Sequence, residues 1–183
     1  DLGPQPENPF QASSLLPDCP TPDFAKEDLK QIEETFSFLN ELLSSPEAVE
    51  QAGEIRDILN SIITFPVPPA GRIYQQQALF HLGLMNTLGL GLPNNTPDYK
   101  SAQEIFNYLI LDPKTPISLS TKAQYELAVL YIHARLPPFY SAARDYFNEL
   151  YERPRVPSSL RFQSLFAMGF MDMHSLGIEK PNY

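Results

Sequence analysis

The chain has 183 residues, of which 43% are hydrophobic, and a formal net charge of −9. This length and composition are typical of a folded protein with a sizeable core and exclude a fully disordered chain. They also disfavour nucleic-acid binding, because contacts to phosphates require clustered lysine and arginine. In this chain acidic residues outnumber basic ones, 22 to 13.

The negative charge is concentrated in the N-terminal third. Residues 1–69 hold thirteen acidic and three basic side chains, whereas residues 70–183 hold nine acidic and ten basic ones. Such charges usually lie on helix faces that contact water. The alternative is that the acidic part contacts a basic partner or a basic neighbouring domain, and the sequence leaves both interpretations open.

Residues 1–22 are predicted to form an extended or disordered arm. Six of the 19 prolines lie in this segment, which has no sustained periodicity. Its Cys19 is the only cysteine, so no disulfide within the chain and no cysteine-based metal site is expected. Because the chain begins at Asp1 without a signal segment, we expect a processed piece of a larger protein or complex.

Residues 23–69 are predicted to form an N-terminal helical pair. Apolar residues recur at helical spacing from Leu29 to Leu43 and again from Ala48 to Ile62. Between these runs, Ser45-Pro46-Glu47 has the composition of a helix start: a capping hydroxyl, a first-turn proline and an acid. The sequence therefore predicts that the second helix begins directly after Ser45.

Residues 70–183 are predicted to hold five further helices, which prolines separate from one another. No segment has a strand period of convincing length. The longest mostly apolar run, residues 78–92, is shorter than the 18–20 apolar residues, roughly, that a membrane span needs. We therefore predict an all-α protein of about seven helices, with the last five near 72–89, 97–111, 119–135, 138–152 and 157–175.

Three stretches of the second region repeat one pattern, and the third stops partway. The pattern contains a small residue within a helix, spaced glycines at the helix end, and a tyrosine, an alanine and an aromatic residue on the next helix. Its copies are Ala78, Leu82-Gly83, Met85, Gly89, Gly91, Asp98-Tyr99, Ala102 and Phe106; Ala123, Leu127-Ala128, Leu130-Tyr131, Tyr140, Ala143 and Phe147; and Met168-Gly169, Met171, Gly177, Ile178 and Asn182-Tyr183. Such a period is typical of a stacked αα solenoid.

These residues resemble the Sel1-like repeat, a relative of the tetratricopeptide repeat. The resemblance covers about two and a half repeats in residues 70–183 and departs from the family pattern at Ala128, where the family prefers glycine, and around 135–138. It implies an αα-superhelix in which residues 23–69 form an atypical or capping repeat. Since Tyr183 coincides with the pattern's tyrosine, we expect the parent protein to continue beyond it.

The glycines have two expected roles. Where two helices of one repeat cross closely, Gly83, Ala128 and Gly169 are expected to be small so that the helices can approach. At the ends of helices, the backbone is expected to turn away through positive φ angles, which glycine adopts without strain, at Gly89, Gly91 and Gly177.

The resemblance implies a role in protein–protein interaction. Roles of the family include assembling membrane-associated complexes, among them the adaptor subunit of endoplasmic-reticulum degradation ligases, and, in bacteria, envelope assembly and host interaction. A sequon at Asn94-Asn95-Thr96 fits a secretory compartment. Together these observations favour the secretory pathway, the ER lumen or the bacterial envelope over the cytoplasm.

The resemblance also implies that partners bind the concave face formed by the first helix of each repeat. That face would carry polar positions such as Gln77 and Lys122, and an aromatic row of Phe80, Tyr125 and Phe166. Such a row suits an apolar peptide or helix of a partner. The alternative is that a tight superhelix buries the row against its own neighbouring helices. The predicted partner-binding residues are Phe80, Leu84, Tyr125, Val129, Ile132, Phe166, Phe170 and Met173.

No catalytic, cofactor or metal site can be assembled from the sequence. The three histidines, His81, His133 and His174, lack ligand spacing and are expected to be packing or surface residues. Cys19 has no neighbouring histidine to activate it. We therefore expect a non-catalytic adaptor or scaffold that binds a protein or peptide. The alternative is a structural subunit whose face is covered by neighbouring subunits.

Overall fold

The computed structural model describes residues 26–45, 47–67 and 69–177, and in this part of the chain all regular structure is helical. The expected arm with Cys19, and Ile178, Asn182 and Tyr183 of the third copy, lie outside the described residues. The α-helices are α1 (Lys26–Leu43), α2 (Ala52–Thr64), α3 (Arg72–Leu88), α4 (Tyr99–Leu111), α5 (Ile117–His133), α6 (Tyr140–Glu152) and α7 (Ser158–Met173). The all-α class predicted from the sequence is confirmed.

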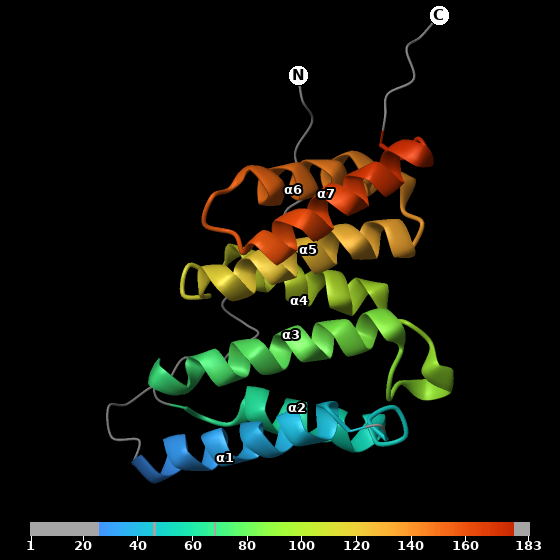
Figure 1. Cartoon of the computed structure of the whole chain (residues 1–183). Coiled ribbons are helices and arrows are strands. Elements are labelled where there is room, and N and C mark those ends of the chain that lie inside the picture. Colours follow the sequence, from blue (N-terminus) through green and yellow to red (C-terminus); the bar gives the residue numbers. More distant parts are fainter. Residues whose placement is uncertain (1–25, 46, 68, 178–183) are drawn as a thin grey trace, which may run out of the picture.

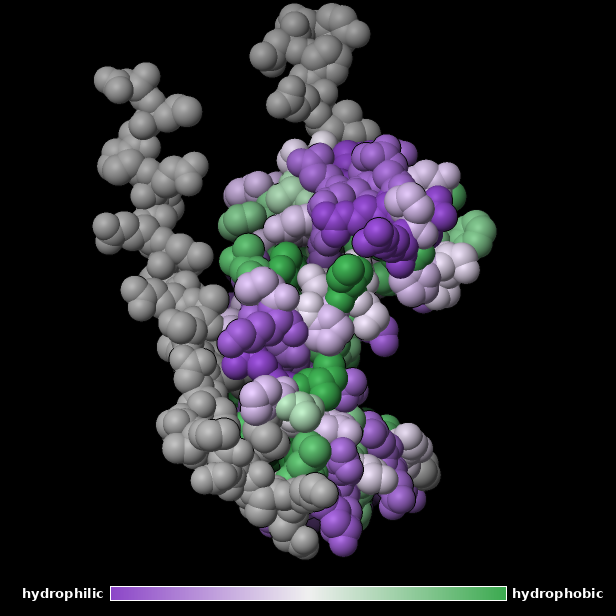
Figure 2. Space-filling view, turned by 90° about the vertical axis from the view of Figure 1, so that its left-hand side faces the viewer, coloured by the Kyte–Doolittle hydropathy of each residue, from purple (hydrophilic) through white to green (hydrophobic). Residues whose placement is uncertain are grey.

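The seven helices are stacked in chain order, and each packs against the next (Figure 1). The odd-numbered helices form one layer, at the front of Figure 1, and α2, α4 and α6 lie behind it. Contacts also join α1 to α3, α3 to α5 and α5 to α7. Figure 2 shows that the molecule is hollowed at its right-hand edge, which is the side of the odd-numbered helices.

The helix boundaries agree well with the predictions after residue 70, where every helix begins and ends within two residues of its expected bounds. The predicted start of α2 is wrong. The Ser45 hydroxyl accepts the Glu47 N–H at 3.2 Å, which closes a short turn, and α2 begins only at Ala52. The start of α4 is capped by Asp98, whose carboxylate accepts the Ser101 N–H at 3.1 Å.

The core runs through the whole stack and contains the repeated positions. Phe106, Phe147 and the alanines at the equivalent places of α4 and α6, Ala102 and Ala143, are fully buried. The N-terminal pair contributes aliphatic residues such as Leu59 instead. Large aliphatic and aromatic side chains therefore fill the space between successive helices, and their burial is the main source of stability.

The three repeated helices end in the same way, although only one uses glycine. One or two positions after the last helical residue, a residue has a positive φ, and the N–H of the residue that follows it donates to a carbonyl five residues earlier, which is the Schellman arrangement. The positive-φ residues are Gly89, Arg135 and Ser175, and the donors are Leu90, Leu136 and Leu176. The repeated pattern therefore specifies a helix end followed by a leucine.

Two of the expected spacer residues meet a close neighbour, and one does not. A Cβ at Gly83 would lie 2.8 Å from a ring carbon of Phe106, so any side chain there would force the ring to shift at the crossing of α3 and α4. Ala128 is fully buried. The expectation for Gly169 is wrong within the described residues, because no atom lies within 4 Å of a Cβ built there. No described helix crosses α7 at that point.

This difference can be tested with one substitution at two sites. Gly83→Leu should lower the free energy of unfolding by about 2–3 kcal/mol, because the new side chain overpacks the Phe106 contact. Gly169→Leu should raise it by up to about 0.7 kcal/mol through helix propensity. Urea denaturation measures the free energy of unfolding of both variants. An equal decrease in the two would contradict the close crossing at Gly83.

Candidate interaction groove

An open apolar groove lies between α5, α6 and α7. Its volume is about 440 Å³, within the usual range for ligand-binding clefts. Four of the eight residues predicted to bind a partner line it: Val129, Ile132, Phe166 and Phe170. The remaining lining residues of this α5–α7 groove are His133, Arg135, Phe147 and Ala167.

Helical spacing explains why these side chains share the groove. Val129 and Ile132 are three residues apart on α5, and Phe166 and Phe170 are four residues apart on α7, so each pair lies on one helix face. The fully buried Phe147 of α6 contributes to the lining from the layer behind. The paired residues of α5 and α7 lie 34 or more positions apart in sequence and are brought together only by the α5–α7 contact.

The groove side chains on α7 are unusually exposed for aromatic and aliphatic residues. The exposed fraction is 80% for Phe166 and 39% for Phe170, and Met173 on the same helix is 77% exposed. The Phe170 ring lies 4.4 Å from the imidazole of His174, measured between centroids. Grouped exposed apolar side chains of this kind usually mark an interaction surface.

The other members of the predicted aromatic row are packed differently. Phe80 and Tyr125 are half-buried, with ring centroids 6.0 Å from Phe106 and 5.5 Å from Phe147, respectively. Burial, followed by the charge of Glu126, raises the pKa of Tyr125. Leu84 is also half-buried against the core. These three side chains therefore contribute to the packing of the stack, which agrees with the alternative that the row is buried against neighbouring helices.

A second, more polar pocket lies lower in the stack, between α1, α3 and α5. It has a volume of about 380 Å³ and is lined by Phe36, Asn40, Gln77, Phe80, His81, Leu119 and Lys122. The sequence placed Gln77, Phe80 and Lys122 on one face but missed the contribution of α1, because α1 carries no repeat signature. Burial, followed by the charge of Lys122, lowers the pKa of His81.

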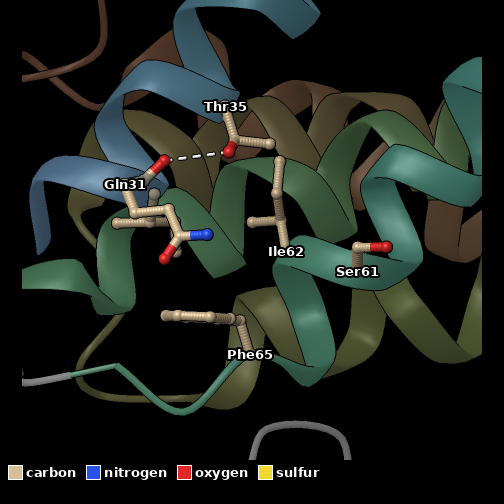
Figure 3. A pocket seen from close by; sticks show the side chains of 6 residues that line it. Gln31, Thr35, Ser61, Ile62 and Phe65 are labelled. Atoms are coloured by element: carbon tan, nitrogen blue, oxygen red, sulfur yellow. Dashed lines mark hydrogen bonds between the residues drawn. The ribbon is translucent and has the colours of Figure 1, made fainter. Parts of the chain in front are cut away.

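A third pocket, between α1 and α2, is too small for most ligands. Its volume is about 120 Å³, and it is lined by Gln31, Ile32, Thr35, Ser61, Ile62 and Phe65. Figure 3 shows Gln31 on α1 and Phe65 on the opposite side of this space, with the Thr35 hydroxyl donating to the Gln31 carbonyl at 2.8 Å. A few water molecules or one small side chain would fill it.

The most polar buried cluster joins α3 to the C-terminal end of α4. Asp112 accepts hydrogen bonds from Arg72 at 3.3 Å, from Gln76 at 3.0 Å and from the Tyr108 hydroxyl at 3.2 Å. Its other carboxylate oxygen accepts the Lys114 N–H at 3.0 Å. Both oxygens are thus occupied by the protein's own donors, so the cluster connects two helices and offers no free carboxylate for catalysis.

Within the described ranges, no three histidine, cysteine or acidic side chains lie close enough together to hold a metal ion. None of the described helices is long and apolar enough to cross a membrane. The sequence matches no protein-family model, and comparisons with curated proteins and with solved structures also give no match.

The packing of the aromatic row predicts unequal effects on stability. Phe80→Ala and Tyr125→Ala should each lower the free energy of unfolding by about 2 kcal/mol, because each ring packs on a core phenylalanine. Phe166→Ala should change it by less than about 0.5 kcal/mol, because the side chain is 80% exposed. Urea denaturation checks this, and a large loss for Phe166→Ala would show that this residue belongs to the core.

The polar cluster predicts a specific dependence of stability on pH. Burial alone would raise the pKa of Asp112, but the Lys114 N–H, Arg72 and Gln76 favour the carboxylate and together lower it. The stabilisation is therefore present above the ordinary pKa of about 4 and is lost as the pH falls through the lowered value.

Asp112→Asn should lower the free energy of unfolding by about 1–3 kcal/mol at pH 7. The difference from wild type should shrink as the pH falls below about 4. Denaturation curves at several pH values measure this. The matched control is Asp145→Asn on the exposed face of α6, for which we expect little change at pH 7. A pH-independent difference at position 112 would contradict the proposed role of the carboxylate.

Proposed function

We propose that this chain is a non-catalytic adaptor or scaffold that binds a peptide or helix of a partner protein in the α5–α7 groove. The observation that carries the proposal is the cleft of about 440 Å³ with Phe166 and Phe170 exposed at its edge. Apolar clefts with a few aromatic anchors are the usual sites for peptides and amphipathic helices. The assembled polar cluster is occupied by structural hydrogen bonds, which supports a binding role over a catalytic one.

The proposal includes an αα-superhelix of the Sel1-like kind, and a recurring arginine contact supports it. Arg56 of α2 donates to the Leu90 carbonyl at 2.7 Å, just after the end of α3. Arg144 of α6 donates to the Leu176 carbonyl at 3.1 Å, just after the end of α7. The two contacts hold equivalent helix ends, so α2 occupies the place before α3 that α6 occupies before α7.

The glycines after these helices support the same equivalence. A Cβ at Gly91 would lie 2.7 Å from the Ala52 carbonyl oxygen, and one at Gly177 would lie 2.7 Å from the Tyr140 carbonyl oxygen. Ala52 and Tyr140 are the first residues of α2 and α6. Both φ angles are positive, so glycine is required for conformation and for space. The N-terminal pair therefore behaves as a repeat that lacks the signature residues.

The exposure of the sequon supports a secretory location as part of the proposal. Asn94 is exposed in the short 3-10 helix η3 (Pro93–Asn95), between α3 and α4. An oligosaccharide needs an accessible asparagine of this kind. This placement is consistent with a secretory compartment and keeps that location part of the proposal.

The groove function can be tested with peptides selected from a displayed library on the wild-type protein. Phe166→Ala and Phe170→Ala should weaken the binding of the selected peptides at least about tenfold, because each removes an aromatic anchor. Phe162→Ala is the matched control, because Phe162 is 69% exposed on the same helix but does not line the groove. The affinity of the Phe162→Ala variant for the selected peptides should change less than about twofold.

Dissociation constants are measured by fluorescence anisotropy, together with the free energy of unfolding of each variant. Failure to select any peptide, or undiminished binding to both groove variants, would contradict the proposal. If Phe162→Ala weakened binding as much as the two groove variants, the interface would lie elsewhere on α7.

The second candidate is a structural subunit whose stack is covered by neighbouring subunits. The exposed Phe162 and Leu165, and the uncovered Gly169, favour it, because they extend the apolar surface of α7 beyond the groove. Light scattering after size-exclusion chromatography separates the two. A stable monomer favours the adaptor, whereas an assembly that Phe162→Ala dissociates favours the structural subunit.

A further inference from the structure

The pocket between α1, α3 and α5 gathers hydrogen-bond donors from three helices. Asn40 comes from α1, Gln77 and His81 from α3, and Lys122 from α5, and no acidic side chain of the described residues lines the space. The pocket volume of about 380 Å³ suits a terminal residue of a peptide. In an acidic chain of net charge −9, a pocket with this donor set is a local exception.

None of these four side chains makes a hydrogen bond or ion pair within the described part of the chain. The amide nitrogens of two buried side chains of α3 are engaged: Gln75 donates to the carbonyls of Ile63 and Phe65, and Gln76 donates to Asp112 and Thr115. The fold therefore uses the amides of Gln75 and Gln76 and leaves the pocket donors available to a ligand.

The remaining side of the pocket is apolar and is held in place by the core. The Phe36 ring lies 5.4 Å from Tyr74, and the Phe80 ring lies 6.0 Å from Phe106, measured between centroids. Leu119 completes this wall at the start of α5. Because Phe36 and Leu119 are buried and Phe80 is half-buried, the wall exists before any ligand binds.

We propose that this pocket binds the C-terminal carboxylate of the partner peptide and places the last, aliphatic side chain of that peptide against the apolar wall. The carboxylate would accept hydrogen bonds from Lys122 and from Asn40, Gln77 or His81, and the side chain would contact Phe36, Phe80 and Leu119. The inference rests on the proposed peptide-binding function and adds the part of the peptide that is recognised.

The state of the imidazole is compatible with this role. Burial and the Lys122 charge lower the pKa of His81, so near neutral pH the ring is uncharged and offers one N–H. Lys122 then supplies the positive charge. A carboxylate is the anion that matches one cation and several neutral donors beside an apolar wall.

The test uses three pools of N-acetylated hexapeptides. The first pool is randomised at five positions and ends in leucine with a free carboxylate, and the second is identical but ends in leucinamide. The third ends in leucinamide and carries aspartate at the fifth position. Retention of each pool on the immobilised wild-type chain is quantified by mass spectrometry.

The free-acid pool should be retained at least about tenfold more than the amide pool, and Lys122→Ala should abolish this preference. The matched control Lys100→Ala, an exposed lysine on α4, should keep it. Equal retention of the acid and amide pools, or a preference that survives Lys122→Ala, overturns the inference and leaves peptide binding intact. Equal retention of the aspartate pool and the free-acid pool assigns the pocket to a side-chain carboxylate and overturns it too. Retention of none of the pools rejects the proposed function as well.

Discussion

The close crossing of α3 and α4 at Gly83 is the constraint on which the arrangement of the stack depends. The absence of a side chain there lets the ring of Phe106 lie against the α3 backbone, and Phe106 in turn fills the space behind Phe80. In the next copy, the fully buried Ala128 and Phe147 occupy the equivalent positions. A larger residue at Gly83 would collide with the Phe106 ring, so the two helices could not pack as closely there.

The two candidate binding regions follow from the same layering. Because α1, α3, α5 and α7 form a single layer, side chains from different helices meet on it without any need for a long loop. The polar pocket forms between α1, α3 and α5, and the α5–α7 groove forms one helix further along. A peptide bound across both would place its charged end and its apolar side chains at sites that different helices form.

The helix ends set the spacing of this layer. In all three copies a residue of positive φ terminates the helix and a leucine follows it, whether the residue is glycine, arginine or serine. The arginines of α2 and α6 then donate to the carbonyls of two of these leucines, Leu90 and Leu176. Capping through the backbone, rather than through a particular side chain, explains why the sequence pattern can weaken between copies while the geometry stays constant.

The sequence by itself determined the helical class, the helix boundaries after residue 70 and the positions of the buried alanines and phenylalanines, because these depend on periodicity, proline and glycine. Only the tertiary structure decided which members of the aromatic row are free. Phe80, Tyr125 and Phe166 occupy equivalent positions, but Phe106 and Phe147 pack against the first two rings. No described helix brings such a ring to Phe166, so aromatic residues at equivalent positions differ in exposure. Asn40 joined the polar pocket for the same reason: the contact between α1 and α3 is a property of packing, and no local pattern in α1 encodes it.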